Sequence, residues 1–314
     1  MSAKVDRKEK FMKGFIGLTK RNMLVYFKDR QAVIFSLLTS IIVFTLYMLF
    51  LRNMYVGMLN KSLDSLSGMI SGDDVEGFIN GFLLAGIMGS ALITVPYNSL
   101  STLVGDKERK IDYDILATPI KRGMIILSYF VAAALSTCIM TSLIMAVGLT
   151  VIQVMGNLYL SAATILSCFG VVIIGSISAT AFFIIFMMFF KSTSASGAFF
   201  GILSAASGFV IGAYIPVSEF SGSVQTVCNF FPASHVTVMI RKMILGGVLD
   251  HMNDAVNGLD GGQLKEGLSE GYGLYAHMFD TNLTTGQNVI YVLGALAVCL
   301  VVMVLVYAKT NKRK

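Results

Sequence analysis

The feature that most constrains the fold is a set of long stretches without Asp, Glu, Lys or Arg. These stretches are 31–51, 77–105, 123–190, 192–218 and 281–308. A bilayer core is about 30 Å thick, and a helix of about 20 apolar residues crosses it. Four stretches fit one crossing each, and 123–190 fits two with a break at 155–159. The sequence predicts an all-α polytopic membrane protein with spans at 32–51, 81–104, 124–154, 160–190, 196–216 and 287–308. A soluble helical domain would need a polar face that these runs do not leave.

The charges between the spans predict the orientation. With the N-terminus inside, the inner segments hold 19 Lys and Arg and seven acidic residues, and the outer segments hold five basic and 11 acidic residues. Basic residues concentrate on the cytoplasmic side of membrane proteins. We expect a multi-pass protein of the bacterial plasma membrane with both termini cytoplasmic. The net charge of +6 then reflects orientation and attraction to membrane lipid, and it does not indicate nucleic-acid binding.

The uncharged segment 220–240 has two interpretations. It could form a seventh crossing, but it is polar for lipid, and a seventh crossing would place the basic residues 309–314 outside. We interpret it as a re-entrant pair of short helices that breaks near Phe231-Pro232, within an external loop 219–286. Such backbone must be surrounded by protein or water. The whole chain, 1–314, is treated as one membrane domain.

Two cytoplasmic segments are amphipathic or highly charged. Residues 1–30 can form an amphipathic helix with a broad apolar side surrounded by basic side chains, which is typical of a helix in the headgroup region. An ordinary basic tail next to the membrane is the alternative. Segment 105–123 is highly charged, with an apolar ridge at Ile111, Ile115 and Leu116. We expect a helix that Asp106, Glu108 and Arg109 begin and Pro119 ends, suited to docking on a cytoplasmic partner. A solvated loop that only supplies positive charge is the alternative.

Several chemistries leave no motif in this chain. No phosphate-binding G-x-x-x-x-G-K-[ST] loop and no H-E-x-x-H zinc motif occur, and no span carries an acidic pair for ion coupling. We therefore expect a transport subunit that is not an enzyme, with no catalytic or metal-ligating residues and no cofactor of its own.

The charged loop also resembles a known family. Glu108-Arg109 followed by 116–120, Leu-Ala-Thr-Pro-Ile, resembles the coupling helix of ABC type-2 permeases, the membrane subunits of type V ABC exporters, of the bacterial half-size type. Between these ends, Lys110-Ile111-Asp112-Tyr113 replaces the family's Gly-Thr-Leu-Glu, and Asp112 or Asp114 is expected to substitute for the family's acid. Segment 18–35 resembles the family's connecting helix.

The resemblance implies a dimer of identical or different permease chains and a separate ATPase subunit that binds ATP and Mg. The residues that would couple to the ATPase are Glu108, Arg109, Asp112, Asp114, Leu116, Thr118 and Pro119. Arg21, Asp29 and Arg30 match the connecting helix, and Pro216, Phe231 and Pro232 match an external gate. The family's translocation path lies between two permeases and is lined largely by spans two and five.

We expect that path, or the helix packing beside it, to involve uncharged residues of these two spans: Phe82, Met88, Leu92, Phe199, Phe200, Gly201 and Gly208. Lipid contact or core packing would equally explain each single residue. An uncharged path favours apolar or amphiphilic cargo, such as a drug, an antimicrobial peptide or a lipid-like molecule. The alternatives are export of lipid-linked cell-wall polysaccharide and a membrane receptor or assembly factor without a transport cycle.

Overall fold

A computed structural model describes residues 2–63, 68–155, 159–257, 261–279 and 281–310, with side chains from residue 12 onward. Within these residues the chain is almost entirely helical, and six helical segments are long and apolar enough to cross a membrane. The predicted all-α polytopic architecture is confirmed. The exception is a small antiparallel pair of strands, β1 (Ala276–Met278) and β2 (Thr281–Leu283). In this pair His277 lies opposite Asn282.

The first span is longer than the charge pattern indicates. After α1 (Ser2–Lys28), Asp29 caps α2 (Arg30–Leu46) by accepting hydrogen bonds from the backbone of Gln31 and Ala32. A π-helical turn (Tyr47–Leu51) then leads directly into α3 (Arg52–Ser62). Residues 52–62 therefore extend the first span beyond its predicted end at residue 51. The continuation is stable because Tyr55 and Leu59 are buried.

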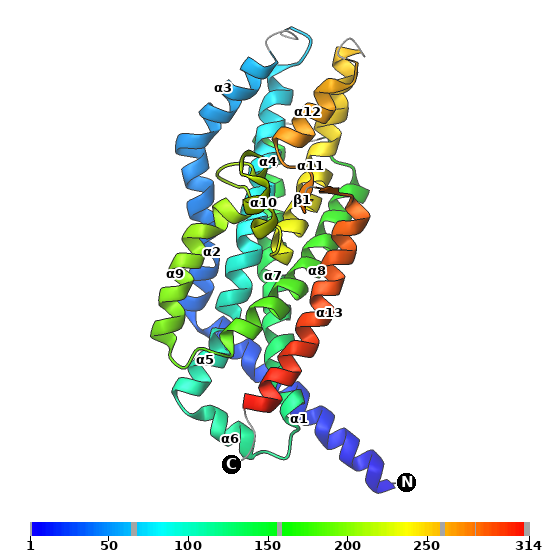
Figure 1. Ribbon diagram of the computed structural model, residues 1–314. Helices are drawn as coiled ribbons and strands as arrows, with labels where there is room; N and C mark the ends of the chain where they lie inside the picture. Colours follow the sequence, from blue (N-terminus) through cyan, green and yellow to red (C-terminus); the bar gives the residue numbers. More distant parts are fainter. Residues whose placement is uncertain (1, 64–67, 156–158, 258–260, 280, 311–314) are drawn as a thin grey trace.

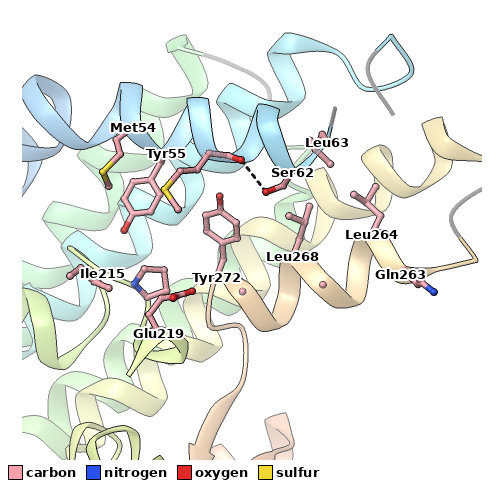
Figure 2. A pocket seen from close by; sticks show the side chains of 14 residues that line it. Met54, Tyr55, Ser62, Leu63, Ile215, Glu219, Gln263, Leu264, Leu268 and Tyr272 are labelled. Atoms are coloured by element: carbon pink, nitrogen blue, oxygen red, sulfur yellow. Dashed lines mark hydrogen bonds between the residues drawn. The ribbon is translucent and has the colours of Figure 1, made fainter. Parts of the chain in front are cut away.

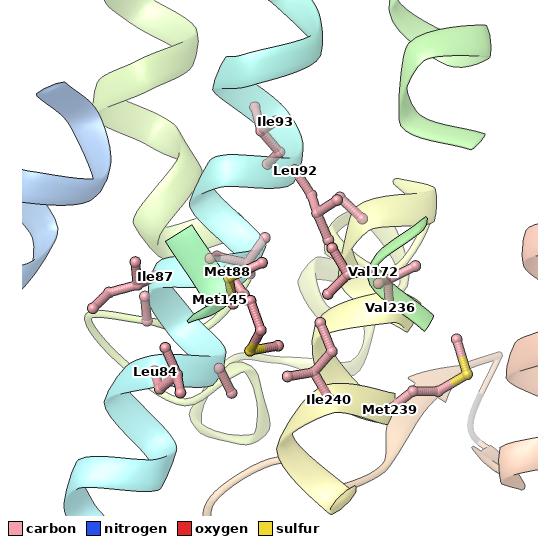
Figure 3. Packing of buried hydrophobic residues seen from close by; sticks show 14 of the residues in the cluster. Leu84, Ile87, Met88, Leu92, Ile93, Met145, Val172, Val236, Met239 and Ile240 are labelled. Carbon is pink, nitrogen blue, oxygen red and sulfur yellow. The ribbon is translucent and has the colours of Figure 1, made fainter. Parts of the chain in front are cut away.

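The second span lies at the centre of the molecule. Helix α4 (Gly72–Ser99) begins nine residues before the expected start, and Ser71 caps it. It continues through a turn at Leu100 into α5 (Ser101–Glu108). Figure 3 shows Leu84, Met88 and Leu92 of α4 packed among side chains of the surrounding helices. The most apolar part of this span is buried entirely inside the protein.

The remaining helices surround α4. In chain order they are α6 (Ile111–Ala117), α7 (Arg122–Met155), α8 (Ala162–Met187), α9 (Thr193–Val210), α10 (Gly222–Cys228), α11 (Pro232–Val256), α12 (Gln263–Gly271) and α13 (Thr285–Thr310). A single 3-10 turn, Val217–Glu219, precedes α10. Helices α7, α8 and α11 pack directly against α4, whereas α13 packs mainly on α8 and α11.

The segment predicted to be re-entrant has its helix break before Pro232, at the expected place, but its two helices are unequal. Helix α10 has seven residues, whereas α11 has 25, so the prediction of two short helices is wrong for the second. Helix α11 stays helical because it packs along α4 and α8, and this packing buries polar residues such as His235 and Arg241. The Arg241 side chain lies inside the protein.

Figure 1 shows an elongated bundle with two distinct ends. Helix α6, the N-terminal part of α1 and the last turns of α13 lie at one end, which we call the α6 end. Helix α12 and the end of α3 lie at the opposite end, which we call the α12 end. This arrangement places the charged loop 105–123 and α12 at opposite ends of the bundle.

Candidate functional site

The charged loop at the α6 end folds into two helices joined by a sharp corner. Helix α5 ends at Glu108, Lys110 adopts a left-handed conformation with φ of 62°, and α6 begins at Ile111. The expectation of one helix that begins at Asp106, Glu108 and Arg109 is therefore wrong. Asp106 and Glu108 belong to the end of the second span, and only residues 111–117 form the separate short helix.

Asp106 joins three helices at this corner. Its carboxylate accepts hydrogen bonds from Arg21 of α1, from both guanidinium nitrogens, and from the Tyr129 hydroxyl of α7 at 2.5 Å. The side chain of Asp106 is only 5% exposed. The hydrogen bond to Asp106 also raises the pKa of Arg21 above its ordinary value. The pair fixes α1 against the membrane domain, and Arg21 was assigned to the connecting helix from the sequence.

Glu108 and Lys107 link α5 to the segment between α8 and α9. The Glu108 carboxylate accepts a hydrogen bond from the Thr193 hydroxyl at 2.5 Å and one from the Thr193 backbone N–H at 3.3 Å. Lys107 donates to the backbone oxygen of Met188 at 2.5 Å. Thr193 is the first residue of α9, so a displacement of this corner would act directly on the fifth span.

Helix α6 presents its apolar side to its own chain and its polar side to the surroundings. Ile115 is buried, and Ile111 and Leu116 pack against the core cluster. The outward side is formed by residues that are exposed: Arg109, Tyr113, Asp114 and Pro119. Leu116, which was predicted to couple to a partner, is half-buried and packs against the core cluster.

The other predicted residues of this end have local partners. The Thr118 hydroxyl donates to the Ile115 oxygen and closes α6. Asp112 is partly buried, and this burial raises the pKa of its carboxyl group. Asp29 caps α2, and Arg30 is exposed. Tyr113, 65% exposed, was not singled out from the sequence, although an aromatic residue between two aspartates was a usable signal.

A lateral cleft of about 720 Å³ opens between α2 and α9. Its walls are mainly apolar, with Phe35 and Leu38 of α2 facing Phe200 and Gly201 of α9. The Thr39 and Ser204 hydroxyls are hydrogen-bonded across the two helices at 2.9 Å, and the Tyr97 hydroxyl donates to the Ser196 oxygen at 3.0 Å. The cleft is therefore an apolar groove with a few hydroxyl groups along its floor.

The exposed face of α9 has little packing within this chain. Only 17% of its most apolar window is buried, Ile202 is 71% exposed and Phe199 is 38% exposed. A Cβ added at Gly197 or Gly201 would meet nothing within 4 Å. Gly208 differs, because a Cβ there would collide with the Tyr214 ring of the turn that ends α9. Gly197 and Gly201 therefore lie on a face of α9 that packs against nothing in the part of this chain that the structure describes. Gly208 instead makes room for the Tyr214 ring in the turn after α9.

Three residues predicted to lie along the path are enclosed by the chain itself. Phe82, Met88 and Leu92 are each 0% exposed on α4. The Phe82 ring lies under the Arg241 guanidinium, with Cζ 4.5 Å from the ring centroid. Met88 and Leu92 belong to the packed cluster of Figure 3. In this conformation the structure does not bring them together with Phe199 and Phe200 on one surface.

Arg241 holds the turn after α9 against the loop after α12. Its guanidinium donates to the oxygens of Gly212, Tyr272 and Gly273 at 3.0 Å each, and the side chain is fully buried. Gly212 has φ of +67°, so a side chain there would be strained. The predicted gate residue Pro216 lies four residues beyond this turn and is buried. Pro232 begins α11, and the Phe231 ring packs on Phe182 at 5.5 Å.

A cavity of about 880 Å³ lies at the α12 end, beside the segment that contains the predicted gate residue Pro216. Figure 2 shows Tyr55 and Leu63 of the α3 region on one side, Leu264 and Leu268 of α12 on the other, and Tyr272 between them. Ile215, Pro216 and Glu219 complete the lining. Burial raises the pKa of Tyr272 to about 12, so its hydroxyl stays protonated at neutral pH. Sequence reasoning missed this cavity because its walls come from segments far apart in the chain.

Comparison with known proteins gives one informative result. No curated protein matches the chain. A family model described as ABC-2 family transporter protein matches residues 62–308, which is most of the sequence. The matched part includes the α5–α6 corner, α9 and the predicted gate residues. Together with the six spans, this match identifies a multi-pass membrane permease. The chain belongs to the ABC-2 family of ABC transporter membrane proteins.

Proposed function

We propose that this chain is the permease subunit of an ATP-driven exporter of the bacterial plasma membrane, with the α6 end in the cytoplasm. A separate ATPase subunit supplies ATP hydrolysis and holds the ATP and Mg. The observation that carries the proposal is the direct connection from the α5–α6 corner to α9 through Glu108 and Thr193. A partner that moves this corner moves α9, whose most apolar window is only 17% buried within this chain.

The outward side of the corner supplies the ATPase contact. Arg109, Tyr113, Asp114 and Pro119 are exposed around α6. Inside the corner, Ile115 and Leu116 pack on the membrane domain. The short helix therefore acts as a rigid part of the permease, and the predicted coupling residues divide into an outer set that meets the ATPase and an inner set that transmits the displacement.

The face of α9 and the cleft beside α2 form the surface toward a second permease chain. Gly197 and Gly201 are open, and small residues at this spacing let helices approach closely. The cleft walls carry no charged side chain. A path enclosed by two such surfaces favours apolar or amphiphilic cargo, including drugs, antimicrobial peptides and lipid-like molecules. Affinity for cargo must differ between the inward and outward states for pumping to occur.

Native co-purification tests the proposal. Tagged chain at native expression should recover a P-loop ATPase and a second permease chain, and the reconstituted complex should hydrolyse ATP faster with transported amphiphiles. A Tyr113→Asp variant should lose the ATPase, whereas Ile290→Asn, on the exposed face of α13, should retain it.

Recovery of folded permease without any ATPase would refute the proposal and favour a receptor or assembly factor. Accumulation of lipid-linked glycan on deletion would instead indicate polysaccharide export.

A further inference from the structure

A second cavity faces the membrane on the side of the bundle away from α9. It has a volume of about 310 Å³ and lies between residues 37–48, from α2 and the π-helical turn after it, residues 80–87 of α4 and residues 143–152 of α7. Its rim is open, because Ile41 on α2 and Val147 on α7 are 55% and 56% exposed. No charged side chain lines it. The groove is therefore accessible to a molecule dissolved in the bilayer.

One buried polar side chain in this groove has no partner. Asn80 is 1% exposed, and neither its amide nitrogen nor its amide oxygen makes a hydrogen bond among the described residues. A buried amide without partners is costly, by about 1–3 kcal/mol for each unsatisfied group. The Ser40 hydroxyl is also unpartnered, but it can turn toward a carbonyl of its own helix. Asn80 differs from Ser40 because both its donor group and its acceptor atom are left without partners within the described part of the chain, and it lines the groove.

The groove is about as long as one lipid chain and begins one helical turn inside a polar level. Glu76 of α4 forms an ion pair with Arg52 at 2.8 Å, and both side chains are partly exposed, which marks the polar level. Asn80 lies one turn further in, about 6 Å along the helix. The groove then follows α2 and the π-helical turn for 11 residues, about 16 Å, and half of a hydrocarbon core is about 15 Å.

We propose that this groove binds a single-chain acyl amphiphile of the outer leaflet whose linkage region carries one hydrogen-bond acceptor and one donor. The Asn80 Nδ2 donates to the ester carbonyl, and Oδ1 accepts from a neighbouring free hydroxyl. The hydrocarbon chain lies along α2 and α7. Monoacylglycerols and lysophospholipids share this chemistry. The small volume favours one chain over two, and the uncharged walls leave the headgroup unrecognised. The site is separate from the proposed export path, and its assignment to the outer leaflet rests on the proposed orientation.

Binding to delipidated, full-length protein tests this assignment. The probes are monoolein, oleoyl-lysophosphatidylglycerol, dioleoylphosphatidylglycerol and methyl oleate, which has the carbonyl but no hydroxyl. Monoolein and the lysolipid should bind wild type with affinities within about threefold of each other, because no charge lines the groove. Asn80→Leu should weaken both about tenfold, as expected for two lost hydrogen bonds. Methyl oleate and the two-chain lipid should bind more weakly than monoolein.

Two further variants keep the test decisive if Asn80→Leu alters folding. Val147→Trp should close the rim and abolish monoolein binding, whereas Ile139→Trp, equally exposed on α7 but outside the groove, should not. A diazirine-labelled monoacylglycerol should label peptides within 37–48 and 143–152. Equal monoolein affinity in wild type, Asn80→Leu and Val147→Trp would overturn the proposal, as would labelling confined to other helices. Tighter binding of the two-chain lipid would reject the single-chain assignment.

Discussion

At the scale of single residues, the structure gives specific partners to charges that the sequence could only assign to a side of the membrane. Asp106 and Arg21 lie 85 positions apart, yet they form a salt bridge at the α6 end. Asp29 caps a helix, and Glu108 accepts from Thr193. No local sequence pattern specifies these pairs, because each depends on how the spans pack around α4.

The Arg21–Asp106 pair should contribute measurably to stability. Arg21→Met leaves the buried Asp106 carboxylate with only the Tyr129 hydroxyl, so we expect a loss of about 1–3 kcal/mol. Thermal unfolding in detergent can be followed with a thiol-reactive dye, because the chain has no Trp and three of its four cysteines are buried. The Arg21→Met/Asp106→Asn double variant should lose less than the two single variants combined. Wild-type stability of Arg21→Met would mean that the pair does not form.

Asp112 should make stability depend on pH. Burial raises the pKa of its carboxyl group, and its Oδ1 has no hydrogen-bond partner among the described residues. The folded state therefore binds this proton more tightly than the unfolded state, so the contribution of Asp112 improves as pH falls from 7 toward about 4. Asp112→Asn should melt at a higher temperature than wild type at pH 7, and the difference should shrink toward pH 4. The exposed neighbour Asp114→Asn serves as control, and a destabilised Asp112→Asn at pH 7 would contradict this.

At the scale of helices, the contact between α5 and α9 transmits the displacement of the α5–α6 corner in the proposed cycle. Glu108→Ala removes the acceptor for Thr193 and should leave folding and ATP turnover near wild type while transport per ATP falls about tenfold. Thr193→Val should have the same effect, and Glu108→Gln, which keeps an acceptor oxygen, should lose much less. Pro119→Ala should also uncouple the two activities. Normal transport by Glu108→Ala would show that this contact does not carry the motion.

The helical elements differ in how far the sequence predicted them. The charge-free runs specified six spans because lipid excludes ionic groups. They did not specify that the first span continues to Ser62 or that α4 begins at Gly72. Contacts with other segments stabilise these additional helical turns. Helix α11 was expected to be short, and nothing in the sequence indicated that Arg241 is buried. The actual helix is long because it packs along α4 and α8, and the buried guanidinium is satisfied by backbone oxygens of two distant segments.

At the scale of the whole molecule, the chain combines a buried central helix with two unlike lateral faces. The α9 face is open and rich in small residues, whereas the face between α2, α4 and α7 holds an apolar groove with one unpartnered amide. The sequence predicted uncharged spans but could not distinguish residues that pack inside the chain, such as Phe82 and Met88, from residues that face outward, such as Ile202. That distinction needs the neighbours of each helix.

The most direct test of the central claim is a pair of distance measurements on the complex reconstituted with its ATPase. Spin labels at Tyr113 and Ile202, in a variant without native cysteines, report the distance from α6 to α9 within one chain and the Ile202–Ile202 distance between two chains. If the corner and α9 move as one lever, trapping ATP should change the distance between chains and leave the distance within each chain constant. A changed distance within the chain, with the distance between chains constant, would contradict the account.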